Sequence, residues 1–162
     1  MPTPLPDLDP ATQRGLAAGL FNRTWELLEM RDRTPAQDDE LVHTAHASRY
    51  HWGELAERPI RLARGEWLCS RVYAVLGRPE PARWHAVRCL AILDEHASSP
   101  DGGGAEDWDR AAACEAVARA EATAGNHEAA ATWRARGLAL CAEIADPQDR
   151  RPIEDDLKSI PG

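Results

Sequence analysis

Apolar residues recur along the chain at intervals of three and four positions, which is the spacing of one face of an α-helix. In the first part of the chain this spacing is followed by Leu16, Leu20, Phe21, Trp25 and Leu28. No segment alternates apolar and polar residues over the length of a strand, and β-branched residues are sparse. The pattern therefore predicts an all-α protein.

Proline and glycine divide this pattern into separate helices. Proline is favoured at the first helical position, especially after an Asp or Thr N-cap, and glycine just past the last turn. These signals predict helices over 9–33, 35–56, 60–76, 79–96, 106–124 and 126–145. A polar, glycine-rich loop is expected at 98–104, and a loose arm at 1–8. Ile153, Leu157 and Ile160 form a last apolar stripe, which is expected to cover the end of the helical stack.

Part of the chain is repeated. Gly77 and Gly125 lie 48 residues apart, and at this offset Arg71 matches Arg119 and Glu80 matches Glu128. Further matches at the same offset are Ala74 with Ala122, Ala82 with Ala130, Arg88 with Arg136, Leu90 with Leu138, Ala91 with Ala139 and Glu95 with Glu143. Self-similarity at such a period is typical of stacked helical units. We therefore expect three helical hairpins, at 9–56, 59–96 and 106–145, within a single domain covering 9–162.

The middle hairpin has an early aromatic residue, small residues where its helices approach and a glycine at its turn. The residues in these positions are Trp67, Tyr73, Gly77, Ala82 and Ala91. With them the unit resembles a tetratricopeptide repeat, although the usual repeat is shorter, about 34 residues. The resemblance implies a superhelical stack of antiparallel hairpins, in which the first helix of each hairpin lines a concave face that binds a partner.

The other two hairpins depart from this pattern. In the third, Glu115 and Glu121 replace Trp67 and Tyr73, while the turn glycine is kept. In the first, Trp25 aligns with Trp67 at an offset of 42, but no turn glycine is present. The segments HASRYHW, GEWLCSRVYAVLGR and EAVARAEATAGN also resemble those of small bacterial helical-repeat proteins of uncharacterised function.

Composition excludes several classes of partner. The 27 acidic residues outnumber the 19 basic ones, which gives a net charge of −8. Nucleic acid and anionic lipid are therefore not expected as partners, because both require basic surface. The N-terminus carries no signal-peptide pattern, and no apolar run reaches the roughly 18 residues of a membrane helix. The four cysteines are dispersed in apolar helical stretches, so we expect buried thiols and a cytoplasmic protein.

Histidines gather in the second predicted helix. One stripe at helical spacing holds Glu40, His43, His46 and Tyr50. Helical bundles use the spacing Glu-x-x-His for metals, provided that a second helix supplies a matching motif. Glu40, His43 and His46 are thus candidate ligands for zinc, iron or manganese. A wider pocket for a non-metal ligand would use His43, His46, Tyr50, His51 and His85; the alternative is that these side chains pack between helices.

The repeat also places a set of residues along the expected concave face. They are Trp25, Glu29, Trp67, Arg71, Glu115 and Arg119. Tryptophan is a frequent anchor in interfaces, and arginine holds a carboxylate by paired hydrogen bonds. The alternative is internal pairing, since Glu115 and Arg119 are i, i+4 neighbours on one helix and Arg71 could pair with either Glu66 or Glu115.

These patterns favour an interaction module that binds a protein or peptide on its concave face. No phosphate-binding GxxxxGK[ST], HExxH or GxSxG motif is present. An enzyme is therefore not the first hypothesis, and no cofactor is expected. An enzyme or ligand-binding protein built around the histidine pocket is the second hypothesis. A homodimer formed through the end helices is a third, because a short stack leaves apolar end faces.

Overall fold

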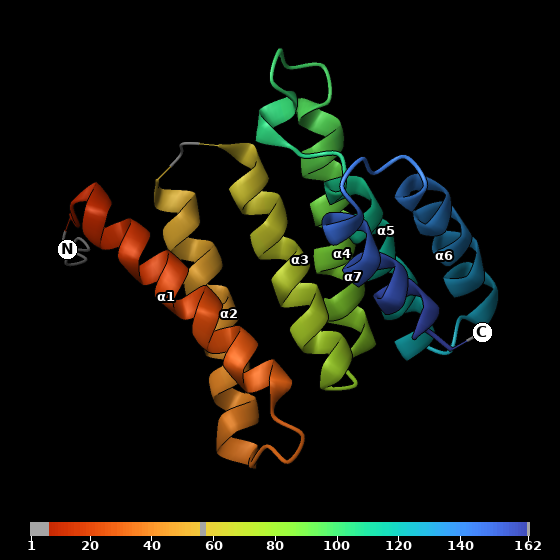
Figure 1. Cartoon of the computed structure of the whole chain (residues 1–162). Coiled ribbons are helices and arrows are strands. Elements are labelled where there is room, and N and C mark those ends of the chain that lie inside the picture. The colour runs from red at the N-terminus through yellow and green to blue at the C-terminus, as the bar shows by residue number, and fades with distance from the viewer. Residues whose placement is uncertain (1–6, 56–57, 162) are drawn as a thin grey trace.

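The computed structural model describes residues 7–55 and 58–161, and within these ranges the chain contains helices and turns but no strand (Figure 1). The helices are α1 (Pro10–Glu29), α2 (Pro35–Glu54), α3 (Pro59–Val75), α4 (Pro79–His96), α5 (Asp109–Thr123), α6 (His127–Cys141) and α7 (Pro147–Lys158), with a short 3-10 turn, η1 (Gly102–Gly104), after α4. The all-α class is thereby confirmed. Most of the arm expected at 1–8 and the expected end of the second helix at residue 56 lie outside the described residues.

Local sequence signals explain where most helices begin. The first residue of α1, α2, α3, α4 and α7 is a proline. At the start of α1, the Asp9 carboxylate accepts hydrogen bonds from the backbone N–H groups of Ala11 and Thr12, both at 3.0 Å. At the start of α2, Thr34 and Gln37 satisfy each other's backbone N–H groups in a capping box. Both predicted starts are confirmed.

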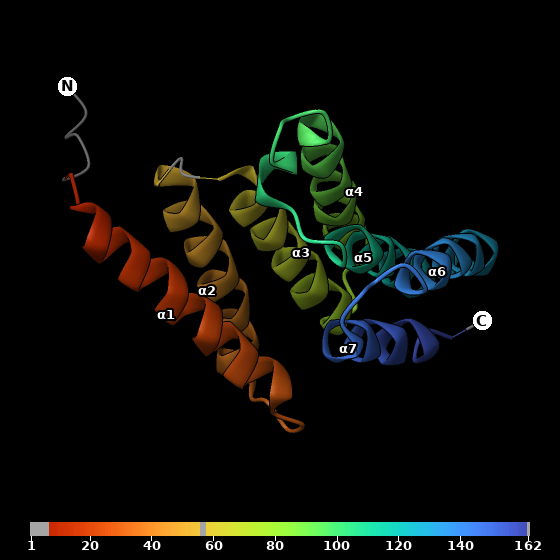
Figure 2. The same cartoon turned by 45° about the horizontal axis from the view of Figure 1, so that its top comes forward.

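The helices pack as three consecutive antiparallel hairpins, α1 with α2, α3 with α4 and α5 with α6 (Figures 1 and 2). Neighbouring hairpins stack through α2 against α3 and α4 against α5. Gly77 and Gly125 close the second and third hairpins with φ angles of 67° and 78°, a region in which residues with a Cβ atom are strained. The helical hairpin stack expected from the repeat is therefore present.

Three helix ends differ from the sequence-based expectation. At each of them a side chain forms a hydrogen bond with a backbone group near the helix end. Near the end of α1, Arg33 donates to the carbonyl groups of Leu27 and Met30, and the helix stops at Glu29 rather than near residue 33. Before α5, the Asp109 carboxylate accepts from the Glu106 N–H, and the helix starts at Asp109. After α6, a carboxylate from the α5 side, Asp107, accepts from the N–H of residue 145, so the helix ends at residue 141.

Helix α7 is more than a short tail. Leu157 and Ile160 are 0% and 2% exposed, and they belong to a core cluster with residues of α5 and α6. Figure 2 shows α7 lying along α5 and α6 rather than beyond them. The apolar stripe expected in this segment is confirmed, but it covers one side of the third hairpin instead of only the end of the stack.

The core is built mainly from alanine, leucine, isoleucine and cysteine. Its four cysteines, Cys69, Cys89, Cys114 and Cys141, are all buried and unpaired, as expected for reduced core residues. The described helices include none with the length and apolar character needed to cross a membrane.

A close approach of α3 to α2 at Gly65 gives a first testable prediction. A Cβ atom at Gly65 would lie 2.7 Å from Arg49 Cγ and 3.3 Å from Arg49 Cα. We expect Gly65→Ala to lower the free energy of unfolding by about 1–3 kcal/mol in urea denaturation, because the two helices would have to move apart. The matched control is Gly19→Ala in α1, where an added Cβ atom would have no neighbouring side chain or helix within 4 Å. That control should raise stability by roughly 0.5–1 kcal/mol. Equal effects of the two changes would contradict the close approach.

Candidate functional site

An apolar cavity is lined by residues of α1, α3, α4, α5 and α7. Its volume is about 270 Å³, and it is partly open to solvent. The large side chains that line it are Phe21, Trp25, Trp67, Leu93, Trp108 and Ile153. We call it the aromatic cavity. Three of its helices, α1, α3 and α5, are the first helices of their hairpins, which are the helices expected to carry the concave binding face.

Aromatic rings form one wall of the aromatic cavity. The ring centroids of Phe21 and Trp25 are 6.5 Å apart, and those of Trp25 and Trp67 are 5.7 Å apart. On the α5 side, the Arg64 guanidinium lies over the Trp108 ring at 4.3 Å from its centroid. Tryptophan thus lines the cavity from two sides and gives it a large, rigid apolar surface.

The charged groups that line the aromatic cavity are paired within the protein. Arg64 donates two hydrogen bonds of 2.9 Å to the Asp109 carboxylate, which is 4% exposed. Asp156 accepts a hydrogen bond from Arg71 at 3.0 Å. Since these charges are neutralised within the protein, the cavity presents mainly apolar surface to an occupant.

One polar atom of a residue that lines the aromatic cavity is not paired. The indole nitrogen of Trp67 is buried and has no hydrogen-bond partner among the described residues. A buried donor without a partner costs about 1–3 kcal/mol.

The two arginines of the expected concave face are held inside the protein. Glu115, 2% exposed, accepts hydrogen bonds from Arg71 at 3.0 Å and from Arg119. Arg71 also reaches Asp156 on α7, and Arg119 donates to the Asp156 carbonyl group and the Ser159 hydroxyl. Burial raises the pKa of Glu115, and the two guanidinium groups oppose that shift. We call Arg71, Glu115, Arg119 and Asp156 the arginine–carboxylate cluster.

The six residues expected on the concave face are therefore divided. Trp25 and Trp67 line the aromatic cavity, whereas Arg71, Glu115 and Arg119 belong to the arginine–carboxylate cluster. The sixth, Glu29, is exposed at the end of α1, outside the cavity lining. Recognition of a partner protein by the arginines stays a prediction. It would require Arg71 or Arg119 to give up its hydrogen bonds to the carboxylates of the cluster.

The histidine pocket expected from sequence is also divided. His46 on α2 and His85 on α4 lie together, with ring centroids 5.2 Å apart. By contrast, His51 interacts with Gln13 on α1, and Tyr50 is 46% exposed. The stripe on α2 therefore does not converge on a single site.

The candidate metal ligands on α2 are likewise not assembled with one another. Arg23 on α1 binds both carboxylate oxygens of Glu40, at 2.7 and 3.1 Å. His43 is exposed. Of the three candidates, only His46 faces other metal-binding side chains.

Sequence reasoning missed the residues that α3 contributes between α2 and α4. Glu66, Cys69 and Tyr73 are spaced i, i+3 and i+7, and all three contact the histidines or lie beside them. It also missed Arg64, Trp108 and the contribution of α7 to the aromatic cavity. The helical spacing of the α3 residues is the signal that could have identified the first group.

No protein-family model, curated protein or solved structure matches this chain.

Proposed function

We propose that this chain is a tetratricopeptide-like interaction module whose aromatic cavity binds an apolar side chain of a partner protein. The observation that carries the proposal is an apolar cavity lined by Trp25, Trp67 and Trp108 on the first helices of the three hairpins or just before them. Hairpin stacks of this kind bind partners along the face formed by those helices.

The size of the aromatic cavity suits a side chain better than a large cofactor. Cavities that enclose drug-sized molecules have volumes of about 300–1,000 Å³, whereas this one has about 270 Å³. One large side chain fills such a space.

The charge of the protein indicates which residues should flank the apolar anchor. A net charge of −8 attracts basic segments and repels acidic ones. The expected partner is thus an amphipathic segment with one large apolar residue and basic neighbours. An acidic segment would depend on Arg71 or Arg119, both of which are engaged by Glu115.

Peptide binding tests this function. The probes are four fluorescein-labelled basic peptides that differ only in their central residue, which is alanine, leucine, phenylalanine or tryptophan. Burying one of the larger side chains contributes about 1.5–3 kcal/mol, so we expect dissociation constants at least about tenfold lower than for the alanine peptide. Fluorescence anisotropy measures them.

A cavity-filling substitution locates the binding. Ala112 on α5 lines the aromatic cavity, so Ala112→Phe should abolish the preference for a large central residue. Ala139→Phe, at an exposed position on α6, is the matched control and should keep it. Equal binding of all four peptides, or an undiminished preference in Ala112→Phe, would refute the proposal.

A further inference from the structure

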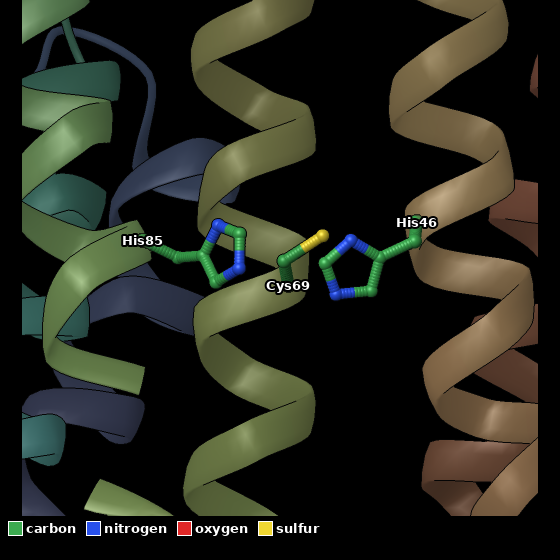
Figure 3. Close-up of side chains that lie close together, drawn as sticks. All are labelled: His46, Cys69 and His85. Carbon is green, nitrogen blue, oxygen red and sulfur yellow. The ribbon is translucent and has the colours of Figure 1, made fainter. Parts of the chain in front are cut away.

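Three side chains with metal-binding atoms meet between α2, α3 and α4. They are His46, Cys69 and His85, one from each helix, and one ligand atom of each lies within 4.8 Å of the other two (Figure 3). Figure 3 shows the Cys69 sulfur between the two imidazole rings. We call these residues the histidine–cysteine cluster. It lies outside the aromatic cavity and is not needed for the proposed peptide binding.

The hydrogen bonds of each ring leave one nitrogen available for a metal. The Nδ1 atom of His85 lies 2.6 Å from the Glu66 carboxylate, which leaves Nε2 as the potential ligand atom. The Nε2 atom of His46 lies 3.0 Å from the Tyr73 hydroxyl, which leaves Nδ1. Metal-bound histidines nearly always use their second nitrogen in this way, because the outer partner fixes the tautomer and the ring orientation.

The carboxylate behind His85 is itself held in place. Glu66 is 3% exposed, and it also accepts a hydrogen bond of 2.8 Å from Arg49. A carboxylate that holds the second nitrogen of a histidine is the carboxylate–histidine–metal arrangement of many zinc sites.

The set of donor atoms determines which metal fits. A thiolate and two imidazoles are soft or borderline ligands, which favour zinc and copper over magnesium or calcium. Three protein ligands leave a fourth tetrahedral position open, and His46 is partly exposed, so solvent can reach the site. Cys69 would bind the ion as a thiolate, because coordination ionises a cysteine thiol.

The distances require only a small closure. Zinc bonds of about 2.0–2.1 Å to nitrogen and 2.3 Å to sulfur place tetrahedral ligand atoms roughly 3.5 Å apart. The ligand atoms here lie within 4.8 Å of one another. Side-chain rotations that move these atoms by about 1 Å would therefore bring them to zinc-binding distances. The partly exposed His46 has the most freedom to move.

We propose that His46, Cys69 and His85 bind one zinc ion, with the fourth position open to water or to a small ligand. The ion would join α2 of the first hairpin to α3 and α4 of the second. Glu66 and Tyr73 are the positioning residues behind the two histidines.

Cobalt binding to the untagged full chain, after removal of metal by a chelator, tests the proposal. Co²⁺ serves as a spectroscopic probe for Zn²⁺, and a thiolate-to-cobalt charge-transfer band that saturates at one equivalent is expected. Zn²⁺ should abolish this band by displacing the cobalt. A spectrum without a charge-transfer band would overturn the proposal.

Two pairs of variants assign the ligands. Cys69→Ala should remove the charge-transfer band, whereas Cys89→Ala, at another buried cysteine, should retain it. His46→Ala should weaken Zn²⁺ binding by more than the roughly 10–100-fold caused by loss of an outer partner. His43→Ala, at an exposed position one turn earlier on α2, should leave the affinity unchanged.

Glu66→Gln distinguishes a metal site from a merely structural contact. It preserves the size of the side chain, and we expect it to weaken Zn²⁺ binding by about 10–100-fold while the charge-transfer band stays. Circular dichroism of every variant reports whether the fold is kept. A band that persists in Cys69→Ala, or an equal affinity of the His46 and His43 variants in a folded protein, would reject the assignment.

Discussion

Arg71→Met is expected to lower the free energy of unfolding by about 3–5 kcal/mol, the usual cost of removing one partner from a buried ion pair. Arg71 is the link between Glu115 on α5 and Asp156 on α7, with hydrogen bonds of 3.0 Å to each. Without it, the carboxylate of Glu115, 2% exposed, retains Arg119 as its one ion-pair partner among the described residues. Urea denaturation followed by circular dichroism measures the loss.

Arg83→Met is the matched control. Arg83 also joins α4 to a buried carboxylate on α5, Glu121, at 2.6 Å, but its own side chain is 60% exposed. Exposed pairs contribute about 0–1 kcal/mol, and Asn126 also donates to Glu121, so a loss below about 1 kcal/mol is expected. If Arg71→Met cost no more than this control, the internal pairing would be unimportant, and Arg71 would be free to hold a partner's carboxylate as the sequence suggested.

The arginine–carboxylate cluster also explains the largest difference between the two repeats. Glu115 takes the place of Trp67 in the third hairpin. From the sequence alone, this exchange suggested a partner-binding residue. In the structure, the Glu115 carboxylate binds the arginine of its own repeat, Arg119, and the equivalent arginine of the preceding one, Arg71. The exchange is thus accounted for by contacts between neighbouring hairpins.

Sequence patterns predicted the fold well because its signals are local. A proline after Asp9 or Thr34 and a glycine at 77 or 125 act through backbone geometry within a few residues. The less accurate boundaries are those at which a side chain from outside the helix hydrogen-bonds a backbone group near its end, as Arg33 does after α1 and Asp107 does after α6. The Asp107 contact joins residues 38 positions apart, so it depends on the tertiary path of the chain.

The candidate sites were harder to predict because helical spacing tells which residues share a face, but not what the face meets. Glu40 and His46 share a stripe on α2, yet Arg23 on α1 binds the first, and the second faces α3 and α4. In the same way, α3 turns Trp67 towards the aromatic cavity and Cys69 towards the histidine–cysteine cluster. Only the packing of the hairpins separates these two uses of one helix.

Both candidate sites share α3, but they respond to different experiments. Filling the aromatic cavity at Ala112 on α5 should alter peptide preference without changing cobalt spectra, because Ala112 is not part of the histidine–cysteine cluster. Conversely, His46→Ala should weaken metal binding and leave the aromatic cavity lining intact. Failure of one proposal would therefore leave the other standing.

Leu157→Ala is expected to destabilise the protein by about 3 kcal/mol, within the range of 2–5 kcal/mol for a fully buried leucine. Leu157 is 0% exposed and lies against Gly137, where an added Cβ atom would be 2.8 Å from a Leu157 methyl group. The missing Cβ atom of Gly137 gives the leucine its place between α6 and α7. Removing the leucine side chain leaves a cavity that the backbones of these two helices cannot readily fill.

The control for this change is Leu16→Ala in α1, where the leucine is 39% exposed and less apolar surface is lost. We expect it to cost under about 1 kcal/mol, measured by the same urea denaturation.

Because Ile153 on α7 lines the aromatic cavity, Leu157→Ala should also reduce binding of the large-residue peptides, through loosening of α7. A protein that lost stability but kept full peptide preference would show that α7 supports the fold without shaping the cavity. Equal stabilities of the two leucine variants would show instead that α7 does not dock on the third hairpin.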